Sequence, residues 1–171
     1  FVTDHLGVPL TGENLRNKLQ ALGHNLRAIT DSDTASRKIN ELTDQYLVEI
    51  RRRLIGKNLI QREASANIIN RLQSATKQTE ILLVSDAGGG KSVCMMEVTE
   101  NLRDAGIPVL SFRLDRLKPT STGFKLGEQM GLEESPAFVL SKLESSEAAV
   151  LVIDQLDAVS TASGRSSDFI N

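Results

Sequence analysis

The chain has 171 residues, a formal net charge of -2 at pH 7 and 40% apolar residues, which is typical of one folded domain or of a domain with a helical extension. The nearly balanced charge gives no basic surface, so nucleic-acid binding is not indicated. No apolar run approaches the roughly 20 residues that cross a bilayer, and the first ten residues do not resemble a secretory signal. With a single cysteine, Cys94, the chain has no internal disulfide, and we expect a cytoplasmic protein without a membrane segment.

Two amphipathic helices are predicted in the first third of the chain. Over residues 13–29, leucine and isoleucine recur at steps of three and four, and a second helix over residues 34–54 has the same periodicity. The inner face of the second helix carries Ile39, Leu42, Tyr46 and Ile50, and Gly56 ends the helix. We predict that the two helices form an α-helical hairpin, which makes residues 1–55 an N-terminal helical region.

The remaining residues, 56–171, alternate between helical and strand patterns. Helices are predicted over residues 64–74, 91–105 and 137–143, the last after the cap signal Ser135-Pro136. Strands are predicted over residues 80–84, 107–114 and 149–153. The last strand is a continuous apolar run, which is typical of a strand buried on both faces of a parallel sheet. The alternation predicts an α/β fold.

Residues 85–92 read Ser-Asp-Ala-Gly-Gly-Gly-Lys-Ser and follow a predicted strand directly. Backbone N–H groups can converge on a polyphosphate only where side chains are absent or small, a condition that Ala87, Gly88, Gly89 and Gly90 meet. Lys91 would supply a charge for the β- and γ-phosphates, and the Ser92 hydroxyl could bind Mg²⁺. The predicted helix after the loop would direct its N-terminal dipole at the same anion.

This loop resembles the phosphate-binding loop G-x-x-x-x-G-K-[ST], with Ser85 in place of the first glycine. Residues 152–157, Val-Ile-Asp-Gln-Leu-Asp, resemble a Walker B segment. The resemblance implies that Asp154 holds Mg²⁺ opposite Ser92. Gln155 stands where many ATPases have a glutamate that polarises the attacking water, so Asp157 is the remaining acidic candidate for that catalytic role.

Together these segments resemble the STAND class of P-loop NTPases, which includes NACHT proteins and is related to AAA+ proteins. The likeness extends over about residues 56–168, and Leu59-Ile60-Gln61-Arg62-Glu63 is similar to the entry segment of those families. By that likeness Leu59 and Ile60 would flank the adenine of ATP. The implied fold is a three-layer P-loop NTPase core.

The resemblance also implies an incomplete parallel sheet. In that architecture the strand after the Walker B strand inserts between it and the P-loop strand, and no such strand follows residue 154 in this sequence. We therefore expect the chain to be the N-terminal part of a larger NTPase, with the later strands and the lid supplied by the parent chain. The expected partners are the nucleotide, the remaining domains of the parent and, on activation, further copies of the chain.

The implied function is a nucleotide-dependent switch in a multidomain protein, of which some bacterial members act in defence or signalling. ATP and Mg²⁺ would bind at residues 87–92, Lys91 and Asp157 would assist hydrolysis in the parent chain, and turnover by these 171 residues would be weak or absent. Two alternatives stay open at this point. One is a P-loop phosphotransferase of a small metabolite, and the other is a vestigial nucleotide-binding scaffold, for which Ser85 and Gln155 are the best support.

Overall fold

The structure is a computed structural model that describes residues 18, 21–23, 32–54, 63–143 and 148–156. The chain divides into two compact units, Phe1–Thr30 and Asp31–Asn171. In the first unit the N–H of Leu22 donates to the carbonyl of Lys18, and Gly23 follows with φ of 80°. A residue in the left-handed region ends a helix rather than continuing it, so the helix predicted over residues 13–29 is interrupted at Gly23. Its predicted pairing with the second helix lies outside the described residues.

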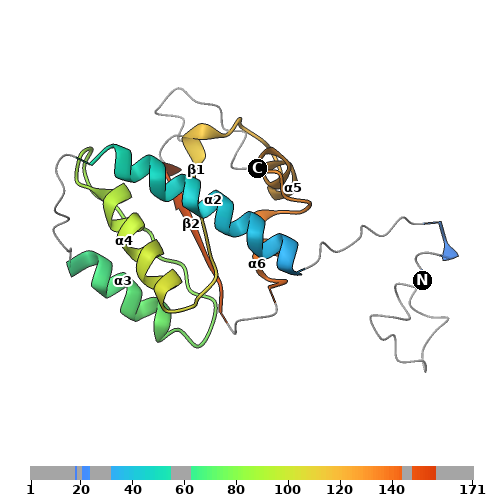
Figure 1. Ribbon diagram of the computed structural model, residues 1–171, viewed down its shortest axis with the longest axis horizontal. Helices are drawn as coiled ribbons and strands as arrows, with labels where there is room; N and C mark the ends of the chain where they lie inside the picture. Colours follow the sequence, from blue (N-terminus) through green and yellow to red (C-terminus); the bar gives the residue numbers. More distant parts are fainter. Residues whose placement is uncertain (1–17, 19–20, 24–31, 55–62, 144–147, 157–171) are drawn as a thin grey trace. The chain divides into compact units, whose positions relative to one another are not determined.

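The second unit is a mixed α/β structure with a small parallel sheet (Figure 1). Its elements are, in chain order, α2 (Ser32–Arg52), α3 (Glu63–Gln73), α4 (Lys91–Asp104), β1 (Val109–Arg113), the short 3₁₀ helix η2 (Leu114–Arg116), α5 (Gly123–Gln129), α6 (Pro136–Leu140) and β2 (Val150–Asp154). The predictions for α2, α3, α4, α6 and both strands are confirmed to within a few residues. At the start of α6, the Ser135 hydroxyl accepts the N–H of Phe138, as the Ser-Pro signal predicted.

The two strands pair in parallel, from Val109 opposite Val150 to Arg113 opposite Asp154. All five residues of β1 are buried, while β2 buries Val152 and Asp154 and half-buries the other three. The parallel pairing predicted for the apolar run at residues 149–153 is therefore confirmed, whereas its predicted burial on both faces is wrong, because three of the five residues of β2 are only half-buried. Because the strands run in the same direction, Arg113 and Asp154 lie side by side at the carboxyl edge of the sheet.

Helices pack on both faces of this sheet. On one face, Val109 and Val152 contact Val98 and Leu102 of α4, and α3 packs beside α4 (Figure 1). The hydroxyls of Thr99 and Ser111 add a buried hydrogen bond of 2.9 Å on this face. The other face of the sheet packs against α5, α6 and the first half of α2. That larger cluster contains Ala35, Ile39, Leu110, Phe112, Leu114, Met130, Leu132, Val139, Leu140 and Leu143.

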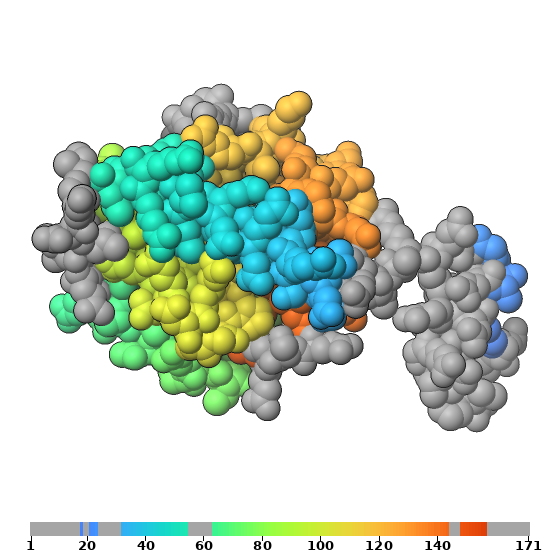
Figure 2. Space-filling view, viewed as in Figure 1, coloured from blue at the N-terminus to red at the C-terminus, as the bar shows by residue number. Residues whose placement is uncertain are grey.

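Helix α2 also closes the outer edge of β1. The Thr43 hydroxyl donates to the Val109 carbonyl at 2.8 Å and accepts the N–H of Ser111 at 3.2 Å, so it takes the place of a neighbouring strand, which no described residue supplies at this edge. Figure 2 shows α2 crossing the visible surface with α4 along one side and η2 and α5 along the other. Helix α2 is thus an integral part of the unit that carries the sheet.

The strand predicted over residues 80–84 needs correction. Residues 80–84 form no strand, and Leu82 and Val84 are 73% and 76% exposed. The reason is that strand formation needs a hydrogen-bonded neighbour, and no described residue pairs with this segment. Conversely, α5 was not predicted, although the Thr122 side chain caps it by accepting the N–H of Lys125. Cys94 is a buried free thiol, with the Ser65 hydroxyl 3.3 Å from its sulfur.

Candidate functional site

The glycine loop has a backbone that side chains would not tolerate. Gly88 and Gly90 both have φ of 79°, in the left-handed region that L side chains rarely adopt. A Cβ on Gly89 would lie 2.5 Å from the Ser85 hydroxyl oxygen and 3.0 Å from the Asp86 carbonyl oxygen. A positive φ thus requires glycine at Gly88 and Gly90, and a close approach requires it at Gly89. Together the three form a tight turn directly before α4.

Helix α4 starts at Lys91 without a side-chain cap. Its N-cap is Gly90, which offers no side chain to the N–H groups of the first turn. The Lys91 ammonium bends back over the loop and donates to the carbonyl oxygens of Ser85 at 2.7 Å and Asp86 at 3.2 Å. Carbonyls hold this cation only weakly compared with an anion, so a phosphate at the helix N-terminus would compete for Lys91.

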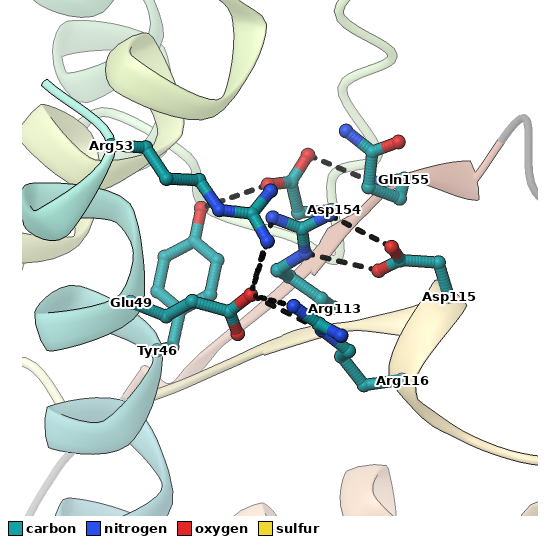
Figure 3. A network of polar contacts seen from close by, with 8 residues as sticks. All are labelled: Tyr46, Glu49, Arg53, Arg113, Asp115, Arg116, Asp154 and Gln155. Atoms are coloured by element: carbon teal, nitrogen blue, oxygen red, sulfur yellow. Dashed lines mark hydrogen bonds and ion pairs between the residues drawn. The ribbon is translucent and has the colours of Figure 1, made fainter.

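Asp154 ends β2 and is 2% exposed. Its Oδ1 accepts the N–H of Gln155 at 2.8 Å, and its Oδ2 accepts the phenol O–H of Tyr46 at 3.5 Å (Figure 3). Gln155 has φ of 62°, a left-handed conformation that costs a residue with a Cβ about 1 to 2 kcal/mol. Such strain is concentrated at functional sites. The backbone turn after β2 and one phenol thus fix both oxygens of the carboxylate.

Tyr46 is 3% exposed and comes from α2. Burial, followed by the neighbouring Asp154 carboxylate, raises the pKa of the Tyr46 phenol far above its ordinary value. The phenol therefore keeps its proton at every physiological pH and acts as a constant donor to Asp154. Tyr46 belongs to the same apolar cluster as Met96 and Val93 of α4, so it links the carboxyl end of β2 to the helix that begins at the glycine loop.

Arg113, beside Asp154 at the carboxyl edge, is the centre of a charge network (Figure 3). It donates to Asp115 through Nε at 3.0 Å and Nη2 at 2.8 Å, and its Nη1 lies 3.5 Å from Glu49 Oε1. The same Glu49 oxygen pairs with Arg116 at 2.6 Å and Arg53 at 2.7 Å. The bond from Arg113 lowers the pKa of the Asp115 carboxyl, and the same bond raises the pKa of Arg113.

The structure places the predicted site residues in two groups. Ala87, Gly88 and Gly89 lie in the exposed loop, and Gly90, Lys91 and Ser92 are half-buried at the start of α4. Asp154 lies at the end of β2, linked to α4 through Tyr46. Leu59, Ile60 and Asp157 lie outside the described residues. Among the described residues, no three histidine, cysteine, aspartate or glutamate side chains are grouped as metal ligands. A Mg²⁺ site built from Ser92, Asp154, water and phosphate needs no such group.

Sequence reasoning missed Tyr46 and Arg113 as parts of this site. Tyr46 was assigned only to the inner face of a helix, since periodicity gives burial but not the partner of a hydroxyl. Arg113 could have been found, because an arginine two residues before an aspartate, at the carboxyl end of a buried strand, falls where ligands bind in parallel α/β sheets.

Within the part of the chain that the structure describes, no helix is long and apolar enough to cross a membrane. In comparisons with known proteins, no protein-family model, curated protein or solved structure matches this chain.

Proposed function

We propose that residues 85–92 bind the polyphosphate of ATP with Mg²⁺, and that the chain is the nucleotide-dependent switch module of a larger P-loop NTPase. One observation carries the proposal: a three-glycine turn leads into an uncapped 14-residue helix whose first residue, Lys91, folds back over the turn. The turn, the helix dipole and the ammonium all favour an anion at the same point.

Asp154 and Ser92 are the proposed Mg²⁺ ligands. A carboxylate at the carboxyl end of the parallel strand β2 and a hydroxyl in the first turn of α4 are hard oxygen ligands of the kind Mg²⁺ prefers. The metal would neutralise charge between the β- and γ-phosphates and orient the γ-phosphate. The residues of the chain would bind the phosphates, hold the metal and fix the direction of the Asp154 carboxylate.

The switch is favoured over the phosphotransferase by the state of residues 80–84. In the strand order of P-loop kinases, the strand before the glycine loop pairs directly with the strand that carries the Walker B aspartate. Among the described residues, β2 pairs with β1 alone, and residues 80–84 pair with neither strand. That arrangement supports the STAND-like order, in which a further strand lies between them. Cytoplasmic location and assembly with the parent domains or further copies belong to the same proposal.

Calorimetry with ATP tests the phosphate site. A charge-assisted hydrogen bond contributes about 1.5 to 3 kcal/mol, so Lys91→Ala should weaken ATP binding by about 10-fold to 100-fold. Lys125→Ala, which removes the same charge from exposed α5, should bind ATP as the wild type does. Equal affinities of the wild type and Lys91→Ala would reject the phosphate site.

The metal assignment has its own test. Asp154→Asn should abolish most of the difference in ATP affinity with and without Mg²⁺, while leaving metal-free binding close to that of the wild type. An undiminished effect of Mg²⁺ would show that Asp154 is only a strand-end cap.

Hydrolysis should be slow, because an amide at residue 155 cannot act as a base. A general base typically contributes about 10² to 10⁴ in rate, so Asp157→Ala should lower phosphate release by the full-length parent, and Gln155→Glu should raise it. Rapid turnover by the 171-residue chain that survives Asp157→Ala would overturn the slow-switch proposal.

A further inference from the structure

In the described part of the chain, the Asp154 carboxylate accepts hydrogen bonds from the N–H of Gln155, in the turn after β2, and from the phenol of Tyr46. Of these two residues, Tyr46 is the one that lies outside the sheet and this turn. It comes from α2, far away in sequence, and both partners are almost fully buried, at 3% and 2% exposure. A buried hydroxyl that reaches a buried carboxylate is seldom a packing accident, because either group left alone would pay its full desolvation cost.

The contact with Tyr46 leaves the Asp154 carboxylate with acceptor positions for a ligand. Each carboxylate oxygen has two lone pairs. The phenol takes one on Oδ2 and the N–H of Gln155 takes one on Oδ1, so as far as the described residues are concerned each oxygen keeps one acceptor position for a ligand. The Tyr46 contact, at 3.5 Å, is longer than the roughly 2.5 to 3.0 Å of an ordinary O–H···O bond and is therefore weak, whereas the Gln155 bond is 2.8 Å. A cation that draws the carboxylate toward itself would change the weaker bond first.

A second side chain of α2 also bonds the carboxyl edge of the sheet. One helical turn further along the same helix, Glu49 holds Arg113 and Arg116, which follow from β1 and η2. Two side chains of α2 therefore bond the carboxyl edge of the sheet, one at each strand. A displacement of Asp154 would directly change its contact with Tyr46 of α2. In the chain, α2 follows the Phe1–Thr30 unit.

From these contacts we infer that Tyr46 is a positioning residue for the metal-binding carboxylate and that α2 senses metal occupancy at Asp154 through it. The inference rests on the proposed function, because it takes Asp154 to be a Mg²⁺ ligand. To the proposed function it adds that α2 is the element whose contacts change with the nucleotide and metal bound at the site. Partners that orient a metal ligand typically change metal affinity by about 10-fold to 100-fold, and the length of this bond puts Tyr46 at the lower end.

The chain contains one tyrosine and no tryptophan, so Tyr46 is its own spectroscopic probe. A phenol bonded to a carboxylate emits weakly, and its fluorescence rises when that bond is lengthened. The experiment titrates MgCl₂ into the full chain at a fixed ATP concentration, which keeps the absorbance of adenine constant, and records Tyr46 emission. We expect emission to rise with the same midpoint as Mg²⁺-dependent ATP binding measured by calorimetry, and Asp154→Asn to abolish the rise.

Tyr46→Phe supplies the second arm. It should reduce the Mg²⁺-dependent gain in ATP affinity by about tenfold and leave metal-free ATP affinity unchanged. Ile50→Val is the matched control, since Ile50 lies in the same apolar cluster, is 2% exposed and has no group that can bond Asp154. That variant should lose stability yet keep the full Mg²⁺ effect.

The outcomes separate the inference from the function beneath it. If Mg²⁺ and ATP bind but emission stays constant, or if Ile50→Val reduces the Mg²⁺ effect as much as Tyr46→Phe does, the inference is wrong and the proposed function stands. If the wild type binds no ATP at all, the proposed function and the inference both fail. A matched rise in emission with a selective loss in Tyr46→Phe supports both.

Discussion

Strand β1 and the segment of residues 80–90 differ in how their backbone and side chains are satisfied. In β1 every residue is buried, β2 pairs one edge, and the Thr43 hydroxyl bonds the other. Residues 80–84 are as apolar as β1, yet Leu82 and Val84 are mostly exposed and no described residue pairs with their backbone. The comparison shows that an apolar run predicts a strand only when a partner for its hydrogen bonds is also present.

The same comparison separates the residues that stabilise the unit from the residues that are proposed to bind a ligand. The groups that hold the fold together surround β1, whereas the groups proposed to hold a ligand lie in the exposed turn before α4 and at the end of β2. Loops that bind ligands are generally drawn from the less stable parts of a fold. We therefore expect substitutions around β1 to change folding and substitutions in residues 80–92 to change binding, and the following predictions test that division.

The largest contrast should come from two leucine truncations. Leu110 of β1 is fully buried, and Leu→Ala in a core typically costs about 2 to 5 kcal/mol, so Leu110→Ala should lower the free energy of unfolding by that amount. Leu82 is 73% exposed, and Leu82→Ala should change the free energy of unfolding by about 0.5 kcal/mol or less. Chemical denaturation of both variants measures the difference. Equal losses would mean that residues 80–84 are buried in solution and that the contrast with β1 is wrong.

The edge contact made by Thr43 should give the next largest effect. Thr43→Val keeps the shape of the side chain but leaves the Val109 carbonyl and the Ser111 N–H without this partner, and a buried unsatisfied group costs about 1 to 3 kcal/mol. Thr43→Ser keeps the hydroxyl and should lose less stability than Thr43→Val. If the serine variant proves the less stable of the two in denaturant titrations, the methyl group rather than the edge hydrogen bonds accounts for Thr43.

Local patterns in the sequence were enough to predict most of the helices. The four-and-three spacing of Ile39, Leu42, Tyr46 and Ile50 predicted α2, and Ser135-Pro136 predicted the start of α6. Local patterns were not enough for contacts between distant segments. Nothing near Thr43 in the sequence indicates that its hydroxyl bonds Val109, because that contact depends on how α2 docks on the sheet.

The candidate site was predictable to a similar degree. The loop glycines and Lys91 were predicted as phosphate ligands because their motif is contiguous, and Asp154 as a metal ligand because an acidic residue ends an apolar strand; these roles stay predictions. The hydrogen bond from Tyr46 could not be predicted, since it joins a helix to a strand that lies 108 positions further along the chain. The positive φ of Gln155 had no local signal either, because glutamine is not a residue that favours the left-handed region.

The carboxyl end of β1 should show a smaller, pH-dependent effect. Arg113 lowers the pKa of Asp115 in the folded state, so the pair stabilises the fold above the unfolded pKa of about 3.9 and loses this contribution as the pH falls through the lowered value. Asp115→Asn should therefore be less stable than the wild type above about pH 5, and the two should converge below about pH 4. Urea denaturation across this range measures the gap.

Asp104→Asn, on the exposed end of α4, is the control for this pH dependence and should show no such loss. A loss in Asp115→Asn that persists undiminished at low pH would show that shape or hydrogen bonding, rather than charge, accounts for the role of Asp115.

The smallest effect concerns the turn after β2, where Gln155 has φ of 62°. At an ordinary position alanine is more stable than glycine by about 0.5 to 1 kcal/mol, because glycine loses more conformational freedom on folding. At Gln155 the sign should reverse, since any Cβ in the left-handed region costs about 1 to 2 kcal/mol and only glycine avoids that cost. Gln155→Gly should therefore be more stable than Gln155→Ala by about 0.5 to 1 kcal/mol, while the same pair at Gln45, exposed on α2, should show alanine ahead. Thermal unfolding of the four variants measures both differences. If alanine is the more stable variant at both positions, the turn after Asp154 is relaxed in solution, and the strain that supports the proposed site at this end of β2 would be absent.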